Sequence, residues 1–381
     1  MDFSYEENEI IMKKYIEDCR NQIKNMFFSD DKIKDEEIKK QRNEMIDIKL
    51  NHTMRVVEDV ARMSKKMDLN IDFTKVVKVS ALLHDIARFN QAVWSDSFND
   101  RNCKEFNGMM HAEYGYHLLY VNDKFKDFNI PNNYKFAISQ AVKYHQVSTL
   151  NGDLAIRFEN KEQLNTELLT GYETLNNSEK IIVATLVQMV KDVDMLDILY
   201  QHLTGEFPVI RPFVTYDVCG DKLSDISKHF DISEDEIIKY NKLENSDISD
   251  MKTIKVPVAN MDKRKLAVPQ DIQNDFLHNI DRDLKELQNR RDWTFITGMW
   301  WRLIHFINNI NFTSNLELVK EKELLDKIYE TYPDEYKPLV EDIFAFTKEK
   351  IIDKILEINN GNVFVKEGTS REITEGLKKA K

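Results

Sequence analysis

The 381-residue sequence has few of the residues that interrupt or cross-link a chain: ten glycines, seven prolines and three cysteines. Gly and Pro mark turns and end helices. Their scarcity, together with apolar residues at spacings of three and four, therefore predicts a mainly α-helical protein with few strands. Cys19, Cys103 and Cys219 are odd in number, scattered and without a CxxC spacing. This pattern is typical of free thiols in a reducing compartment rather than of a disulfide framework.

Basic residues are outnumbered by acidic ones, and long apolar runs are scarce. The chain has 54 Lys and Arg against 66 Asp and Glu, a net charge of −12, so it lacks the basic surface that coats nucleic-acid polymers or anionic membranes. The first residues do not show the basic region followed by an apolar region that a secretion signal has. The densest apolar window, residues 294–312, contains Arg302 and His305, so it is a poor membrane span. We expect a cytoplasmic protein with no nucleic-acid polymer and no membrane as partner. The sequence leaves open whether the protein forms a homo-oligomer.

The sequence does contain an ordered series of imidazole and carboxylate groups. His52, His84 and His145 each end or continue an apolar helical stripe, so each is expected to point where the core residues point. The candidate ligands in chain order are His52, His84, Asp85, His111, His145 and Asp194. Divalent ions accept such ligands, and the series predicts a site for one or two ions. A core imidazole bonded to a backbone carbonyl is the alternative for any single histidine.

Two neighbouring aspartates compete for the last ligand position. Residues two apart lie about 200° apart around an α-helix, so Asp192 and Asp194 cannot share a face. Asp194 continues the apolar stripe of Val187 and Val190, whereas Asp192 lies with Gln188 on the more polar side. A lone carboxylate in an apolar stripe requires a partner. Asp194 is therefore the predicted ligand, with Asp192 held in reserve.

Residues 208–258 differ in pattern from the rest of the chain. A short strand, a Gly turn, two helices and an alternating strand that ends at Pro257 are predicted, and Ser233 to Glu236 has the spacing of a capping box. The segment resembles a LysM domain through these residues: Tyr216, Val218, Gly220, Asp221, Leu223, Ile226, Phe230, Ile232, Ile237, Asn241, Leu243, Ile254, Val256 and Pro257. The spacing from Tyr216 to Gly220 is one residue short, and Asp250-Met251 replaces the usual Pro-Gly. LysM domains generally bind N-acetylglucosamine polymers, but these departures and the position within another domain favour a structural or protein-contact insertion, with glycan binding as the alternative.

The histidine series resembles the HD-domain superfamily of metal-dependent phosphohydrolases. The matching motifs are His52-Thr53-Met54-Arg55-Val56, Ala81 to Phe89 around His84-Asp85, His111-Ala112-Glu113-Tyr114-Gly115, Ala141 to His145, and Lys191 to Asp197. The resemblance implies that His52, His84, Asp85 and Asp194 bind the first ion. His111 and His145 then bind a second ion, with Asp85 bridging, or face the phosphate. Met195 departs from the family, since many members have a basic residue at that position.

Chemistry follows from these ligands. A divalent ion (Mn, Mg, Co, Fe, Ni or Zn) held by imidazoles and carboxylates lowers the pKa of bound water and polarises a phosphoryl oxygen. Arg55 and Arg88, each one turn after a ligand, are candidate phosphate-binding groups, and ordinary salt bridges are their alternative. Lys143 is a further candidate for phosphate contact, and Glu113 for proton transfer to the leaving oxygen.

The predicted function is hydrolysis of a small phosphorylated metabolite, with a nucleotide or cyclic nucleotide as the favoured substrate. A non-catalytic HD scaffold whose LysM-like insertion binds a glycan or protein is the competing hypothesis. The predicted fold is a mainly α HD-domain helical bundle with a small α+β LysM-like insertion. Five segments are expected: an N-terminal helical extension (1–44), the HD core (45–207), the insertion (208–258), C-terminal helices packing on the HD domain (259–360) and a polar tail (361–381). Trp293, Trp300 and Trp301 in the fourth segment could stack a nucleobase, although their spacing is more typical of core.

Overall fold

The computed structural model describes residues 3–28, 31–100, 103–146, 177–206, 208–278, 287, 290, 293–310 and 312–359. The chain forms two compact units. The first comprises Met1–Asp197, Ile310–Glu317 and Glu357–Lys381, and the second comprises Ile198–Asn309 and Leu318–Leu356. The expected polar tail, 361–381, lies outside the described residues.

Helices build the first unit. They are α1 (Tyr5–Asn25), α2 (Lys32–Lys66), α3 (Ile71–Leu83), α4 (Ile86–Trp94), α5 (His111–Tyr116), α6 (Asn132–Tyr144) and α8 (Asn177–Thr204), with 3₁₀ turns at Lys104–Phe106 and Lys124–Asp127 and a π-helical turn at His117–Val121. Side chains cap three of the N-termini: Ser4 accepts from Glu7 N, Asp31 from Ile33 N and Asn70 from Phe73 N. Such caps satisfy backbone donors that a helix leaves without partners in its first turn.

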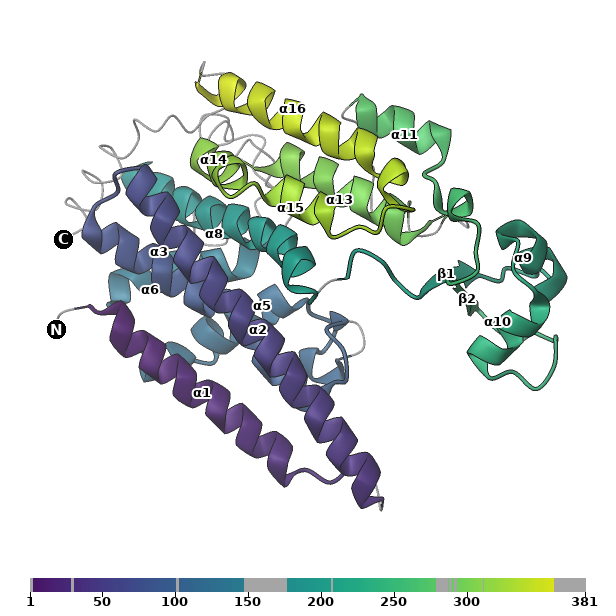
Figure 1. The fold of residues 1–381 in the computed structure, drawn as a ribbon. Coiled ribbons are helices and arrows are strands. Elements are labelled where there is room, and N and C mark those ends of the chain that lie inside the picture. Colours follow the sequence, from purple (N-terminus) through teal and green to yellow (C-terminus); the bar gives the residue numbers. More distant parts are fainter. Residues whose placement is uncertain are drawn as a thin grey trace. The chain divides into compact units, whose positions relative to one another are not determined.

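The long helix α2 is central to the first unit. It lies beside α1 and α3 (Figure 1) and also contacts α4. Its stripe of Val56, Val60 and Met63 is fully buried. The charged stretch from Asp31 to Glu44 provides the N-cap and the first turns of this continuous helix. It is not wholly solvated, because Asp35 and Arg42 are buried. Arg42 contacts Asp96 and the carbonyl of Val93.

The second unit contains the only sheet among the described residues. Strands β1 (Phe213–Asp217) and β2 (Thr253–Pro257) are antiparallel, with Phe213 opposite Pro257 and Tyr216 opposite Ile254. Helices α9 (Leu223–Phe230) and α10 (Glu234–Asn241) lie between them in the chain (Figure 1). Val214 and Val256 of the strands are buried, as the alternating strand pattern predicts, and Ile226 and Ile237 of the two helices are also buried. Gly220 has φ +87, which suits the turn after β1.

Further helices follow β2. They are α11 (Gln270–Leu277), α13 (Phe295–Asn309), α14 (Thr313–Glu321), α15 (Leu324–Glu330) and α16 (Glu341–Asn359), with 3₁₀ turns at Lys263–Leu266 and Lys337–Leu339. The mainly α fold with a small α+β unit is therefore confirmed. Among the described helices, none combines the length and the apolar character that crossing a bilayer would require.

Candidate metal centre

Six side chains from six helix positions converge in the first unit. His52 lies in the middle of α2, His84 ends α3, and Asp85 precedes α4. His111 begins α5, His145 ends α6, and Asp194 projects from α8. The apolar stripes of these helices bury the group: all are at most 2% exposed except Asp194, whose side chain is 25% exposed. Asp194 is thus the most exposed of the six side chains.

The nitrogen and oxygen atoms lie close enough to share a cation. His52 Nε2 lies 3.0 Å from His84 Nε2, 3.1 Å from Asp194 Oδ1 and 3.3 Å from Asp85 Oδ2. The other Asp85 oxygen, Oδ1, lies 3.2 Å from His111 Nε2 and 3.7 Å from His145 Nε2. Three overlapping groups have ligand atoms within 4.8 Å of one another: His52, His84 and Asp85; His84, His145 and Asp194; and Asp85, His111 and His145.

Contacts at the far side of each imidazole fix its orientation. His84 Nδ1 lies 2.6 Å from the carbonyl of Ala81, and His145 Nδ1 lies 2.8 Å from the carbonyl of Val142. A carbonyl only accepts, so in both rings the proton is on Nδ1 and the Nε2 lone pair faces the cluster. His52 Nδ1 and His111 Nδ1 face carboxylates in the same way, those of Asp197 and Asp100. This is the arrangement that metal-binding histidines adopt.

The donor set fits a divalent cation. Lone pairs of four imidazoles and two carboxylates that all face one another repel unless positive charge lies between them. Asp85 Oδ1 is buried and accepts no hydrogen bond from the residues that the structure describes, although buried oxygens normally do. Imidazole and carboxylate are ligands for Zn and other first-row divalent ions. Each oxygen of Asp85 could therefore be offered to a bound cation.

Electrostatics favour positive charge at this position. Burial and Lys49 act to lower the pKa of His52, but bonds to Asp194, Asp197 and Asp85 outweigh them and raise it to about 10. Burial would raise the pKa of Asp85, but Lys49 and the surrounding histidines hold it well below its usual range. Burial lowers the pKa of His145 and keeps that imidazole neutral. A proton on His52 and a metal ion are alternative ways to balance the carboxylates.

Three residues that support the cluster were missed by the sequence analysis. Asp197 Oδ2 lies 2.6 Å from His52 Nδ1. Asp100 accepts from the backbone N of His111, and its Oδ2 lies 2.9 Å from His111 Nδ1. Lys49 Nζ lies 2.6 Å from Asp85 Oδ2. Lys49 precedes His52 by three residues, which places both on one helical face, and this spacing is a signal that could have identified it.

The four other predicted residues lie at different distances from the cluster. Arg55 donates to both oxygens of Asp197, and Arg88 donates to Asp100 Oδ1 at 2.6 Å. Both guanidiniums therefore contact a carboxylate that orients a candidate ligand. Lys143 lies over the ring of Tyr116, 4.9 Å from its centroid. Glu113 is exposed in the first turn of α5. The phosphate and proton-transfer roles of these residues stay predictions.

Asp192, the reserve ligand, has a different environment. It is fully buried, and its carboxylate accepts from Gln188 Nε2 at 2.7 Å and from Phe312 N at 3.0 Å. Its backbone carbonyl accepts from Asn315 Nδ2 at 2.7 Å. The helix face of Asp192 and Gln188, expected to be the more polar one, is buried because residues 312–317 cover it. Asp192 thus attaches the start of α14 to α8.

Comparison with known families agrees with this geometry. Residues 50–195 match the HD domain, and residues 219–257 match the LysM domain. No curated protein and no solved structure matches the chain. The chain therefore contains an HD domain, the module of a superfamily of metal-dependent phosphohydrolases that bind divalent metals. It also contains a LysM domain, and LysM domains bind glycans such as peptidoglycan or chitin.

Proposed function

We propose that this chain is a metal-dependent phosphohydrolase for a small phosphoester, with a nucleotide or cyclic nucleotide as the favoured substrate. One observation carries the proposal: four imidazoles, each turned by a contact at Nδ1, direct Nε2 toward the carboxylates of Asp85 and Asp194. A core histidine needs no such convergence of several Nε2 atoms on shared carboxylates.

Two ions fit this cluster better than one. The two oxygens of Asp85 face different histidine pairs, Oδ2 toward His52 and His84 and Oδ1 toward His111 and His145. Asp194 adds a carboxylate to the first pair. A bound divalent ion lowers the pKa of a coordinated water and polarises a phosphoryl oxygen.

The chain's own cations then orient the substrate. Lys49 Nζ, 16% exposed, is adjacent to Asp85 and can meet a phosphoryl oxygen from the side of α2. Arg55 and Arg88 hold Asp197 and Asp100, so in this proposal they fix the histidines and add positive potential at the mouth of the site. Asp194, the most exposed of the six ligands, lies on the side from which a phosphoester enters.

Hydrolysis assays test this function. The purified chain is supplied separately with Mn²⁺, Co²⁺, Mg²⁺, Fe²⁺, Ni²⁺ or Zn²⁺ and given p-nitrophenyl phosphate, bis-p-nitrophenyl phosphate and a panel of nucleotides and cyclic nucleotides. We expect metal-dependent release of phosphate or p-nitrophenol, abolished in the Asp85→Ala, Asp194→Ala double variant. The matched control is Asp123→Asn, an exposed position of the same unit. Activity that survives the double variant would refute the proposal.

Glycan binding by the LysM domain is a second candidate function. It is supported by the family match and by a rigid frame: Asn241 donates from Nδ2 to the carbonyl of Lys255 and accepts from the N–H of Lys255 at Oδ1. Sedimentation with insoluble peptidoglycan and with chitin tests it, with cellulose as the reference polymer. Retention on the first two alone supports glycan binding, and equal recovery in all supernatants contradicts it.

A further inference from the structure

One further side chain lies against the metal centre of the first unit. Gln146 follows His145, the residue that ends α6, and it is partly buried. Its amide nitrogen, Nε2, lies 2.8 Å from His111 Nδ1 and also contacts His111 Nε2. The end of α6 thus places a carboxamide beside a predicted ligand that comes from the neighbouring helix α5. Gln146 is not part of the motifs from which the six ligands were predicted.

Only one of these two contacts can be a hydrogen bond to the ring. His111 Nδ1 lies 2.9 Å from Asp100 Oδ2, and a carboxylate only accepts, so the proton of the neutral ring is on Nδ1. A protonated ring nitrogen has no lone pair for the Gln146 amide. The amide N–H therefore donates to His111 Nε2, which also faces Asp85 Oδ1, an acceptor, at 3.2 Å. Gln146 supplies a donor at a point where two lone pairs face each other.

A cation at this point changes the role of the amide. A lone pair of His111 Nε2 that binds an ion cannot also accept from an N–H group. The oxygen and the nitrogen of a carboxamide have nearly the same shape, so a half-turn of the amide places Oε1 where Nε2 was. The oxygen then faces the ion. The same side chain can therefore fill the site in the metal-free chain and bind the ion in the loaded chain.

The two halves of the cluster differ in their number of predicted ligands. Beside the shared Asp85, the first ion has two histidines and Asp194. Of the six predicted ligands, the second ion has His111 and His145 in addition to Asp85. An amide oxygen from Gln146 gives this ion a fourth protein ligand. Carbonyl-type oxygens suit Mg²⁺ and Mn²⁺ in particular.

We propose that Gln146 is a ligand of the second ion, and that its amide changes from donor to acceptor when that ion binds. In the metal-free chain Nε2 donates to His111 Nε2, and in the loaded chain Oε1 binds the cation. The proposal rests on the two-ion centre of the proposed function. It adds a residue that favours Mg²⁺ or Mn²⁺ in one half of that centre.

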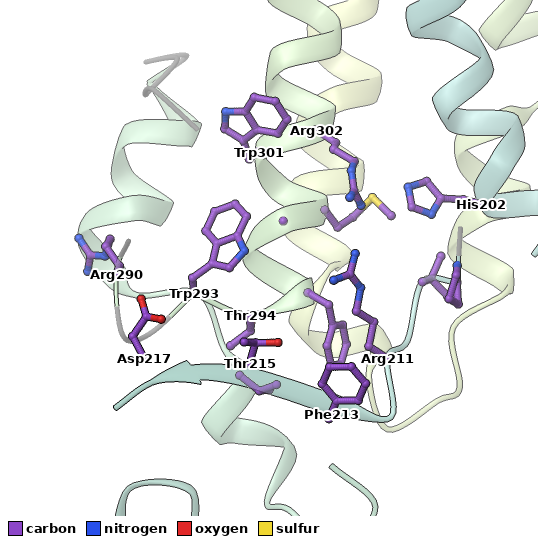
Figure 2. Close-up of a pocket in the computed structure, with 16 residues that line it drawn as sticks. His202, Arg211, Phe213, Thr215, Asp217, Arg290, Trp293, Thr294, Trp301 and Arg302 are labelled. Carbon is purple, nitrogen blue, oxygen red and sulfur yellow. The ribbon is translucent and has the colours of Figure 1, made fainter. Parts of the chain in front are cut away.

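A titration counts ions over the whole chain, so the second unit has to be considered as well. It contains a cavity of about 290 Å³ (Figure 2). Among the lining residues that the structure describes, Arg211, Arg290 and Arg302 are cationic and one, Asp217, is a carboxylate. A divalent cation prefers several oxygen ligands and no neighbouring positive charge. Both ions are therefore expected in the first unit.

Titration of the metal-free full chain with Mn²⁺, measured by calorimetry and by competition with a chelator, tests the role of Gln146. The unchanged chain should bind two ions with separable affinities. In Gln146→Leu the first affinity should stay the same and the second should fall roughly 10- to 100-fold. Gln146→Glu keeps an oxygen at this position but loses the N–H groups, so it should bind the second ion at least as tightly as the unchanged chain.

The matched control is Gln22→Leu, the same chemical change at an exposed glutamine of α1 in the same unit. Both of its affinities should equal those of the unchanged chain. Unfolding temperatures in EDTA show for each variant whether the fold is retained without metal. Loss of the second ion in Gln146→Leu and its recovery in Gln146→Glu is a pattern that a merely structural hydrogen bond does not produce, because a carboxylate cannot donate.

Several results would overturn the assignment. One is equal affinity for the second ion in the unchanged chain and in Gln146→Leu. Another is equal weakening in Gln146→Leu and Gln146→Glu, since the amide would then act only as a donor. A third is a single bound ion in the unchanged chain, which leaves metal-dependent hydrolysis possible. A chain that binds no ion at all would contradict the proposed function together with this inference.

Discussion

At the residue scale, the identity of the acceptor at each Nδ1 determines what the metal centre can do. Backbone carbonyls orient His84 and His145, whereas the carboxylates of Asp197 and Asp100 orient His52 and His111. A carboxylate makes the imidazole a stronger donor to a metal than a carbonyl does. The four histidines are therefore not equivalent, and each half of the cluster has one ring of each kind.

Substitution of the two neighbouring aspartates separates ligand from structural roles. We expect Asp194→Ala to lose bound metal, because its Oδ1 lies 3.1 Å from His52 Nε2. Asp192→Ala should keep the metal but lower the free energy of unfolding by about 1–3 kcal/mol, since Phe312 N and Gln188 lose a buried acceptor. Elemental analysis and denaturant unfolding measure the two effects. Metal loss in Asp192→Ala with retention in Asp194→Ala would reverse the assignment.

Asp197 provides a test of positioning. Asp197→Asn removes the charge that faces His52 Nδ1 and Arg55 while preserving the shape of the side chain. We expect metal affinity, measured by titration with a competing chelator, to fall roughly 10- to 100-fold with the stoichiometry unchanged. Asp47→Asn is the control, since Asp47 is an exposed carboxylate of α2 that pairs with Arg20. Equal affinities in the two variants would show that Asp197 does not act through His52.

The candidate ligands could be predicted from the sequence, but the residues that orient them could not. His52, His84 and His145 are visible because each ends or continues an apolar stripe, a local pattern that one helix displays by itself. Asp197 and Asp100 were missed because their function depends on contacts 145 and 11 residues away, which no local period reveals. The buried environment of Asp192 was missed for the same reason: its cover comes from residue 312, 120 positions later.

At the element scale, the approach of α5 to α6 sets the spacing of two histidines. Gly115 in α5 faces Val142 in α6, and a Cβ at this glycine would lie 3.0 Å from Val142 Cγ1. Val142 is fully buried and has little room to move. His111 begins α5 and His145 follows α6, so any separation of these helices displaces both rings.

Gly115→Ala tests this dependence. The added methyl favours helix formation, but overpacking costs about 1–3 kcal/mol, so we expect a net loss of about 1 kcal/mol in unfolding free energy and weaker metal binding. In the Val142→Ala background the same change should cost less, because Cγ1 is gone. Thermal unfolding and metal titration of the four proteins in this cycle give the coupling. If the effects of the two substitutions on metal binding were additive, the contact between Gly115 and Val142 would not control the geometry of the metal centre.

Element boundaries followed from local signals where those signals were strong. The capping Ser233, the turn at Gly220 and the strand end at Pro257 are short-range features, and α10, the turn and β2 begin or end there. Residues 32–44 were harder to interpret. Their alternating charges resemble those of a solvated segment. In the structure, however, they belong to the same helix as His52, and tertiary contacts bury Asp35 and Arg42.

At the scale of the whole molecule, bound metal should stabilise one unit and leave the other unchanged. All six candidate ligands belong to the first unit, so a cation there binds only when that unit is folded. A ligand at 100 times its Kd adds about 2.7 kcal/mol, which for a domain of this size corresponds to roughly 5–10 °C in Tm. The shift should grow with the logarithm of the metal concentration.

Removal of the metal with EDTA tests this expectation, with hydrogen exchange and calorimetry as the measurements. On addition of EDTA we expect faster exchange at amides of α2, α3 and α6, which hold His52, His84 and His145, and a lower first transition temperature. Amides of β1, β2 and α10 serve as an internal reference, because none of the six ligands lies in the second unit. Asp85→Asn should unfold at the chelated temperature whether or not metal is added, since both of its oxygens face histidine Nε2 atoms. If metal raised the Tm of Asp85→Asn as much as that of the unchanged chain, the stabilising ion would bind elsewhere. The assignment of the six-residue cluster as the metal centre would then be wrong.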